Sequence, residues 1–146
     1  MKRLRVFLLQ IRDFLLDLIT SSWFSYDTRS KINGLNWRIH QDDADPWPSI
    51  PHMHAIEKPF LKLDIYTRTV YDKRTKKRVE TVRRKDLQKI WTDEKIFPII
   101  MHNREKHQGD PRLSPIPYYA EGMLNRQINQ NDQQAEIKLT EGTAHD

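Results

Sequence analysis

The chain has 146 residues, a length that predicts one compact domain with a single core. It contains no cysteine, which excludes disulfides, thiolate metal sites and cysteine nucleophiles, so that any metal would need His, Asp or Glu ligands. The net charge is +5, from 25 Lys and Arg against 20 Asp and Glu. A chain without cysteine fits a reducing compartment, and we expect a cytoplasmic protein.

The first part of the chain predicts an amphipathic helix over residues 2–20, with apolar residues at every third or fourth position. Charged residues interrupt the apolar run well before the roughly 20 residues that a bilayer span needs, so we expect no membrane association. These charges are Arg12, Asp13 and Asp17. Leu9 and Leu16 fall on the opposite side of the helix. The helix is therefore either a core helix with two exposed leucines or a docking helix for a protein partner or a second copy. Binding to a membrane surface is a third alternative, which the acids on the polar side disfavour.

Residues 35–82 predict a mainly antiparallel sheet. The stretch LNWRIH alternates apolar and polar residues and places His40 at the end of the polar face of a strand. The next stretch, HQDDADPWPSIPHMHA at residues 40–55, contains three prolines, which favour extended backbone before them and predict a stiff loop. Beyond it, LKLDIYTRTVYDKRTKKRVETV alternates again and predicts a meander with a tip at residues 72–77.

Histidines at both ends of this loop form the candidate reaction centre. His52 and His54 are two residues apart, so a strand would point both imidazoles to the same face. Antiparallel pairing with the strand that ends at His40 would gather all three rings on one polar surface. The predicted catalytic set is His40, Asp42, Asp43, His52 and His54.

Two chemistries suit this set. Histidines can act as general base and general acid in cleaving RNA through its 2′-hydroxyl, which requires no cofactor. Alternatively, the set offers ligands for zinc or another divalent metal with an open position for water, a combination that supports hydrolysis. The predicted ligands are His40, His52, His54 and Asp42. The remaining interpretations are a purely structural metal, or a loop whose prolines pack on the core, whose aspartates cap turns and whose histidines have no chemical role.

Positive charge is concentrated in the meander and the helix after it. Residues 62–95 contain twelve Lys and Arg against six acids, and five of the six residues 73–78 are basic. Such clusters bind phosphate groups in a sequence-independent way, although a solvated turn is the plain alternative. The predicted nucleic-acid-binding residues are Lys62, Arg68, Lys73, Arg74, Lys76, Lys77 and Arg78. Trp47, Tyr66 and Tyr71 would add base stacking if they share an open face.

The later part of the chain predicts helices at about residues 84–108, where Leu87, Ile90 and Trp91 share one helix side. Residues 123–146 are polar and poor in aromatics, which predicts a mobile tail. The fold predicted for residues 1–122 is α+β, with the N-terminal helix and two or so later helices packed on a small, mainly antiparallel sheet.

The stretch DDADPWPSIPHMHA follows the strand LNWRIH and precedes KLDIYTRTVYD and RRKDLQKIW. In this order it resembles small uncharacterised proteins of bacterial toxin–antitoxin operons, which carry an Asp-Asp-His-x-Pro-Pro-His-x-His signature between strands. The resemblance covers about residues 35–91. The matching positions are Asp42, Asp43, Pro51, His52 and His54. Ala44 stands at the position of the first signature histidine, and His40 is placed to substitute for it from the previous strand.

The resemblance implies a toxin-like or mobile-element defence role. Together with the histidines and the basic hairpin, it leads us to expect a protein that acts on RNA, as a small His-dependent ribonuclease. A binding module without catalysis is the alternative. It would use the basic hairpin for nucleic acid or the N-terminal helix for a protein partner.

Overall fold

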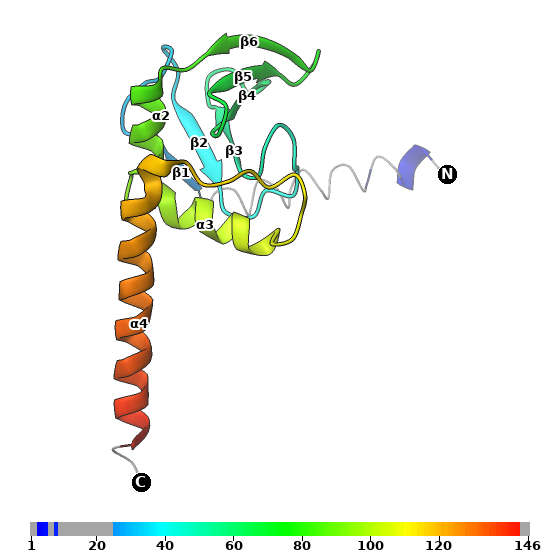
Figure 1. The fold of residues 1–146 in the computed structure, drawn as a ribbon. Coiled ribbons are helices and arrows are strands. Elements are labelled where there is room, and N and C mark those ends of the chain that lie inside the picture. The colour runs from blue at the N-terminus through cyan, green and yellow to red at the C-terminus, as the bar shows by residue number, and fades with distance from the viewer. Residues whose placement is uncertain (1–2, 6–7, 9–24, 144–146) are drawn as a thin grey trace. The chain divides into compact units, whose positions relative to one another are not determined.

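A computed structural model describes residues 3–5, 8 and 25–143 of the chain (Figure 1). The strands are β1 (Ser25–Asp27), β2 (Trp37–His40), β3 (His52–Ala55), β4 (Leu61–Asp64), β5 (Thr69–Asp72) and β6 (Lys77–Thr81). The helices are α2 (Arg84–Trp91), α3 (Ile96–Lys106), the 3-10 turn η1 (Tyr118–Ala120) and α4 (Glu121–Thr143). The fold is therefore α+β, as predicted. The chain divides into residues 1–114 and residues 115–146, eight residues earlier than the predicted start of the tail.

The six strands form one antiparallel sheet in which each strand pairs with its neighbours in sequence, in the order β1-β2-β3-β4-β5-β6. The sequence predicts all of these strands except β1, whose three residues are too few to show an alternating pattern. Asn33 and Gly34 make the tight turn before β2 with φ angles of 52° and 74°, a conformation that both residue types tolerate.

The hydrophobic core lies on one side of the sheet, and β2 shows this by burying alternate residues. Trp37 and Ile39 of β2 are fully buried, while Arg38 and His40 between and beyond them are partly exposed. Leu87, Ile90 and Trp91 of α2 are also buried, which agrees with the predicted apolar side of this helix. The indole Nε1 of Trp91 donates a hydrogen bond of 2.8 Å to the carbonyl of Ile65, so this large core side chain has its polar atom satisfied.

The helix predicted for residues 2–20 lies mostly outside the described residues. Arg3, Leu4, Arg5 and Leu8 are helical. The two predicted faces of this helix, and the docking role that depends on Leu9 and Leu16, fall on residues that the structure does not describe. Among the described residues, no helix combines the length and the apolar character needed to cross a membrane.

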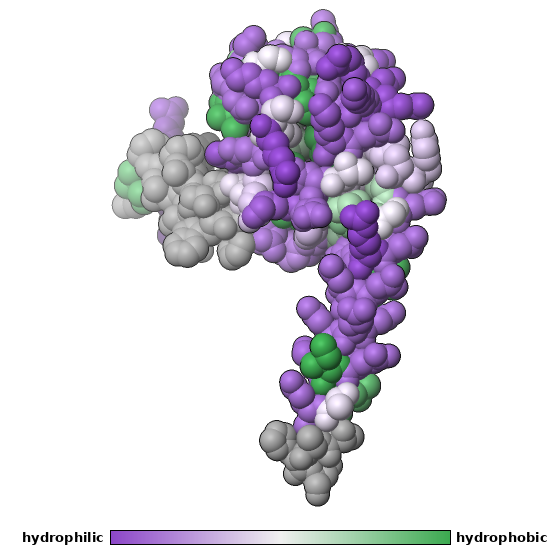
Figure 2. Space-filling view, turned by 90° about the vertical axis from the view of Figure 1, so that its left-hand side faces the viewer, coloured by the Kyte–Doolittle hydropathy of each residue, from purple (hydrophilic) through white to green (hydrophobic). Residues whose placement is uncertain are grey.

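The unit formed by residues 115–146 differs from the expected tail, because α4 runs through Glu121–Thr143. The sequence is polar there, as noted, but polarity does not exclude a helix. The segment has no proline after Pro117, and it is rich in Gln, Glu, Leu and other residues of good helix propensity. Figure 2 shows a mostly hydrophilic surface along this helix, interrupted by a small apolar group. Its exposed apolar residues are Ile128, Ile137 and Leu139.

Candidate reaction centre under the proline loop

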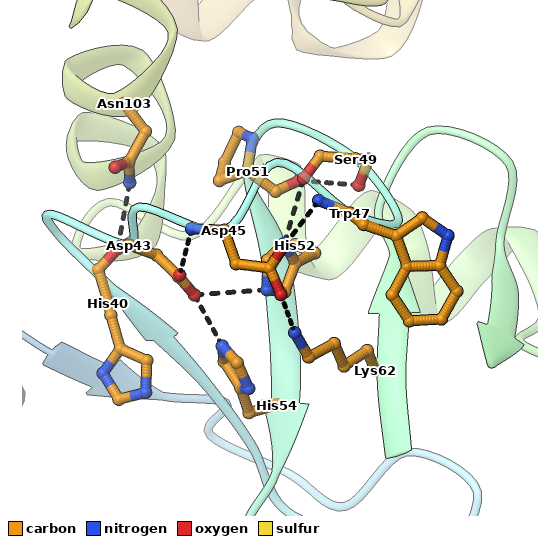
Figure 3. A network of polar contacts seen from close by, with 10 residues as sticks. All are labelled: His40, Asp43, Asp45, Trp47, Ser49, Pro51, His52, His54, Lys62 and Asn103. Atoms are coloured by element: carbon orange, nitrogen blue, oxygen red, sulfur yellow. Dashed lines mark hydrogen bonds and ion pairs between the residues drawn. The ribbon is translucent and has the colours of Figure 1, made fainter. Parts of the chain in front are cut away.

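The loop between β2 and β3 places three histidines together, as the sequence predicts. Arg38 pairs with His54 across the two antiparallel strands, a register that brings His40 at the end of β2 toward the start of β3. The ring centroid of His54 lies 4.9 Å from that of His40 and 4.8 Å from that of His52 (Figure 3).

Asp43 of the loop joins two of these histidines. Its Oδ2 lies 2.7 Å from Nε2 of His54 and 3.1 Å from Nε2 of His52. Its other oxygen, Oδ1, accepts a hydrogen bond of 3.0 Å from the backbone N–H of Asp45, which fixes the carboxylate in a local turn. The side chain of His52 is completely buried, whereas those of Asp43 and His54 are 17% and 23% exposed. The cluster therefore has a buried inner side and an accessible outer side.

The tautomer of His52 is fixed by the backbone. Nδ1 lies 3.0 Å from the carbonyl oxygen of Ser49, and since a carbonyl only accepts, Nδ1 carries the proton. In the neutral ring Nε2 then presents its lone pair toward the carboxylate of Asp43. Although the 3.1 Å distance suits an ion pair, Nε2 is buried and makes no hydrogen bond of acceptable geometry with the described residues. A lone pair that faces a carboxylate favours a cation between them, either a proton on Nε2 or a metal ion.

The charges in the cluster follow from burial and hydrogen bonding. Burial opposes ionisation of Asp43, but the neighbouring His52 and the hydrogen bond with His54 outweigh it and hold the pKa of this carboxyl well below its usual range. Burial lowers the pKa of His40 to about 4, and the neighbouring His54 acts in the same direction. Burial also lowers the pKa of His54, opposed by its hydrogen bond to Asp43. Metal ligands are deprotonated, so an ion bound at Nε2 of His54 would displace the proton that this nitrogen donates to Asp43.

Asp42, a predicted catalytic residue and metal ligand, does not join this cluster. Its Oδ1 accepts hydrogen bonds from Lys106 and, at 3.0 Å, from Nε2 of His102, both on α3. The bonds from Lys106 and His102 lower the pKa of Asp42. Asp42 therefore ties the loop to α3 through Lys106 and His102. Among the described residues, the group whose ligand atoms all lie within 4.8 Å of one another is Asp43, His52 and His54.

The predicted nucleic-acid-binding residues have different surroundings. Lys62 is buried, with 2% of its surface exposed, and its Nζ lies 2.5 Å from Oδ2 of Asp45. It stands opposite His54 on the sheet face that the proline loop covers, so it is not free to bind phosphate. Arg74 is exposed but bonded to Asp72, and its guanidinium lies 3.8 Å from the ring centroid of Phe60.

The remaining basic residues lie on or near the hairpin of β5 and β6. Arg68 is partly buried with a φ angle of 66°, and it donates a hydrogen bond of 3.4 Å to the carbonyl of Val82. Lys76 is exposed, and its ammonium lies 3.8 Å from the ring centroid of Trp47. Lys73, Lys77 and Arg78 are exposed at the hairpin.

Tyr66 anchors the proline loop instead of offering a free stacking surface. Its hydroxyl donates a hydrogen bond of 2.6 Å to the carbonyl of Ile50 and accepts one of 2.9 Å from Nη1 of Arg104. Arg104 also donates to the carbonyl of Ser114 at 2.5 Å. These bonds connect the loop that carries Asp43 to the end of β4 and to α3.

The hydrogen-bonded hydroxyl of Tyr66 predicts a loss of stability at high pH. Burial raises the pKa of Tyr66, although the hydrogen bond from Arg104 acts in the opposite direction. Above a pH of about 10, where a tyrosine of the unfolded chain loses its proton, folded Tyr66 keeps it, so the free energy of unfolding falls as pH rises through this range. In Tyr66→Phe this part of the decline should be absent in urea unfolding curves measured between pH 8 and pH 11. An unchanged decline would contradict the assignment, and Tyr118→Phe, an exposed tyrosine, is the control.

A cavity opens beside the cluster on the side of α3. It has a volume of about 360 Å³, and its lining residues are Asp42, Asp43, Ala44, Asn103, Lys106 and His107. Asn103 supports this wall, because its Nδ2 donates a hydrogen bond of 3.0 Å to the carbonyl of His40. A second cavity of about 400 Å³ includes Thr28, Lys89 and Asp93 in its lining but no histidine. The smaller cavity therefore borders Asp43.

Comparison with known proteins assigns no family. No family model, no curated protein and no solved structure matches the chain. Its function is therefore inferred from the geometry and charge of the described residues.

Proposed function

We propose that this protein is a toxin-like hydrolase that cleaves RNA, with Asp43, His52 and His54 as ligands of one divalent cation of the zinc class. The observation that carries the proposal is the tautomer of His52. The Ser49 carbonyl holds the proton on Nδ1, and the buried Nε2 faces Asp43. Histidines that bind metals commonly donate their other N–H to a backbone carbonyl in this way.

The distances between the ligand atoms suit such an ion. Zinc–nitrogen bonds of about 2.0–2.1 Å in a tetrahedral site place neighbouring ligand atoms roughly 3.4 Å apart. Oδ2 of Asp43 lies 3.1 Å and 2.7 Å from the two Nε2 atoms, so a small outward shift of the partly exposed His54 would complete the site. Two imidazoles and one carboxylate favour zinc over magnesium, which prefers oxygen ligands.

The protein supplies three ligands and leaves the accessible side of the cluster for water and substrate. A bound zinc ion lowers the pKa of a water ligand and stabilises charge on a phosphoryl oxygen. In the hydrolysis proposed here, a water oxygen bonds to phosphorus, and the bond from phosphorus to the leaving ribose oxygen breaks. His40, beside His54 but outside the ligand set, accepts the proton that water loses, and solvent protonates the leaving oxygen. The exposed lysines and arginines of the hairpin support RNA as the substrate, and the resemblance of residues 35–91 supports the toxin-like role.

The test is an RNA cleavage assay with the full chain, with and without a chelator. We expect cleavage that is lost with the chelator, restored by zinc, and at least about 100-fold slower in His52→Ala/His54→Ala, since loss of a reaction centre is typically of this order or larger. His102→Asn is the matched control, because His102 lies outside the cluster. This variant should cleave RNA with the same rate constants as the intact chain.

Other results would separate the alternatives. Cleavage that depends on His52 and His54 but resists the chelator would contradict the metal and favour paired imidazoles as acid and base. Absence of cleavage by the intact chain would contradict the hydrolase and favour a binding module that uses the basic hairpin.

A further inference from the structure

The register of four strands lines up a row of side chains that starts at the candidate centre. His54 pairs with Lys62, Lys62 pairs with Tyr71, and Tyr71 pairs with Arg78. Directly opposite residues of a sheet point to the same face. With strands about 4.8 Å apart, the row extends about 14 Å from His54 to Arg78. This row therefore joins the cluster to the basic hairpin on one face.

Aromatic and basic side chains meet along the row. Trp47 of the proline loop lies edge-on to Tyr71, with 5.4 Å between their ring centroids. Lys76 lies over the ring of Trp47, and Figure 3 shows Trp47 beyond Lys62 as seen from His54. Both rings are partly exposed, while Lys76 and Arg78 are exposed. We call this surface the strip; it consists of Trp47, Tyr71, Lys76 and Arg78.

The buried Lys62 makes the floor of the strip neutral. Its ammonium is paired with Asp45, so the cations that the strip itself offers to a ligand are those of Lys76 and Arg78. Base–aromatic stacking is in general stronger than an exposed cation–π contact, so a base can displace Lys76 from the indole ring. The released ammonium would then reach the phosphate next to that base.

We propose that the strip binds one unpaired strand of nucleic acid and directs it to the cluster. This inference rests on the proposed function and narrows its substrate to single-stranded RNA. Duplex RNA hides the faces of its bases, whereas an unpaired strand offers bases for stacking and phosphates for the two cations. An acidic peptide would satisfy the cations but would leave the two rings without partners.

The experiment is a fluorescence anisotropy titration with a labelled oligouridine of ~12 nucleotides, a length within the usual range of single-strand sites. The full chain is used with a chelator to prevent cleavage. We expect Tyr71→Ala to weaken binding about tenfold and Tyr71→Phe to retain it, because stacking needs the ring and not the hydroxyl. Lys76→Gln/Arg78→Gln should lower the slope of log K against log salt by about 1.4, since each phosphate contact on a single strand contributes about 0.7. Lys85→Gln, at an exposed position of α2 outside the strip, is the control.

Several results would contradict the proposal that the strip binds an unpaired strand. The proposal would be contradicted if duplex RNA bound as tightly as single-stranded RNA, or if polyglutamate competed as well as the oligonucleotide. Unchanged binding by Lys76→Gln/Arg78→Gln would also contradict it. Single-stranded DNA should bind comparably, because the strip contacts base faces and phosphates, and binding restricted to RNA would contradict it. Circular dichroism verifies folding, and the exposed Lys76 and Arg78 keep the test valid if Tyr71→Ala unfolds.

Failure of the strip and failure of the proposed function give different results. If only the strip is wrong, cleavage persists, with the same KM for single-stranded RNA in Lys76→Gln/Arg78→Gln as in the intact chain. If only the hydrolase is wrong, the oligonucleotide binds at the strip, also in His52→Ala/His54→Ala, and no RNA is cleaved.

Discussion

Zinc should raise the unfolding temperature of the metal-free protein, and Asp43→Asn should abolish this shift. A ligand present at 100 times its Kd stabilises the folded state by about 2.7 kcal/mol. For a domain of this size, with about 2–4 °C for each kcal/mol, the expected shift is about 8 °C. Asp43→Asn preserves the size of the side chain but removes the negative charge between His52 and His54, so zinc should lose its binding site. Differential scanning fluorimetry with and without zinc measures the shift.

The neighbouring residue provides a matched control for this result. Asp42→Asn removes the same charge one position earlier, where the carboxylate contacts Lys106 and His102 instead of the cluster. It should change the stability of the metal-free protein while leaving the zinc shift intact. A zinc shift that survives Asp43→Asn, or an equal shift with magnesium, would contradict the proposed ligand set. In either case we would conclude that a proton, and not a metal ion, lies between His52 and Asp43.

Regular alternation explains why the sheet and the gathering of the histidines could be predicted from the sequence. In a strand, two-residue spacing determines the face on which a side chain lies, so His52 and His54 share a face once β3 is recognised. Pairing of β2 with β3 follows from the loop that joins them. Both steps need only local periodicity and the preference of consecutive strands for pairing.

Irregular backbone explains why the sequence could not choose between Asp42 and Asp43. Both precede the prolines and carry the same functional group, and no periodicity orients a side chain in such a loop. The choice depends on the hydrogen bond from the backbone N–H of Asp45 to Asp43 and on the position of α3, which brings Lys106 to Asp42. The second of these is a contact between residues 64 positions apart.

The sequence pattern also does not predict which part of the sheet the proline loop covers. Alternation assigns Lys62 correctly to the polar face of β4, but it does not reveal that the proline loop folds over this part of the face. The result is a buried lysine where an exposed phosphate-binding residue was predicted. Likewise, a polar composition predicted a tail at residues 123–146, although helix propensity was sufficient for α4.

We predict that replacing Asp45 destabilises the fold more than replacing its ion-pair partner Lys62. Lys62 is almost fully buried, whereas the side chain of Asp45 is 40% exposed. Asp45→Asn keeps the Oδ1 that accepts the N–H of Trp47 but leaves the buried ammonium without a counter-charge, so it should destabilise the fold by about 3 kcal/mol. Lys62→Met removes the buried charge and leaves a hydrated carboxylate, so it should cost less than about 1 kcal/mol.

Urea unfolding of both single variants and of Lys62→Met/Asp45→Asn measures these differences. The double variant should recover most of the stability that Asp45→Asn loses, because no buried charge then lacks a partner. A larger loss in Lys62→Met than in Asp45→Asn would contradict this account. Since Lys62 is bonded to Asp45 beneath the strip, Lys62→Met should also bind single-stranded RNA with the same salt dependence as the intact chain, in contrast to the variant of Lys76 and Arg78.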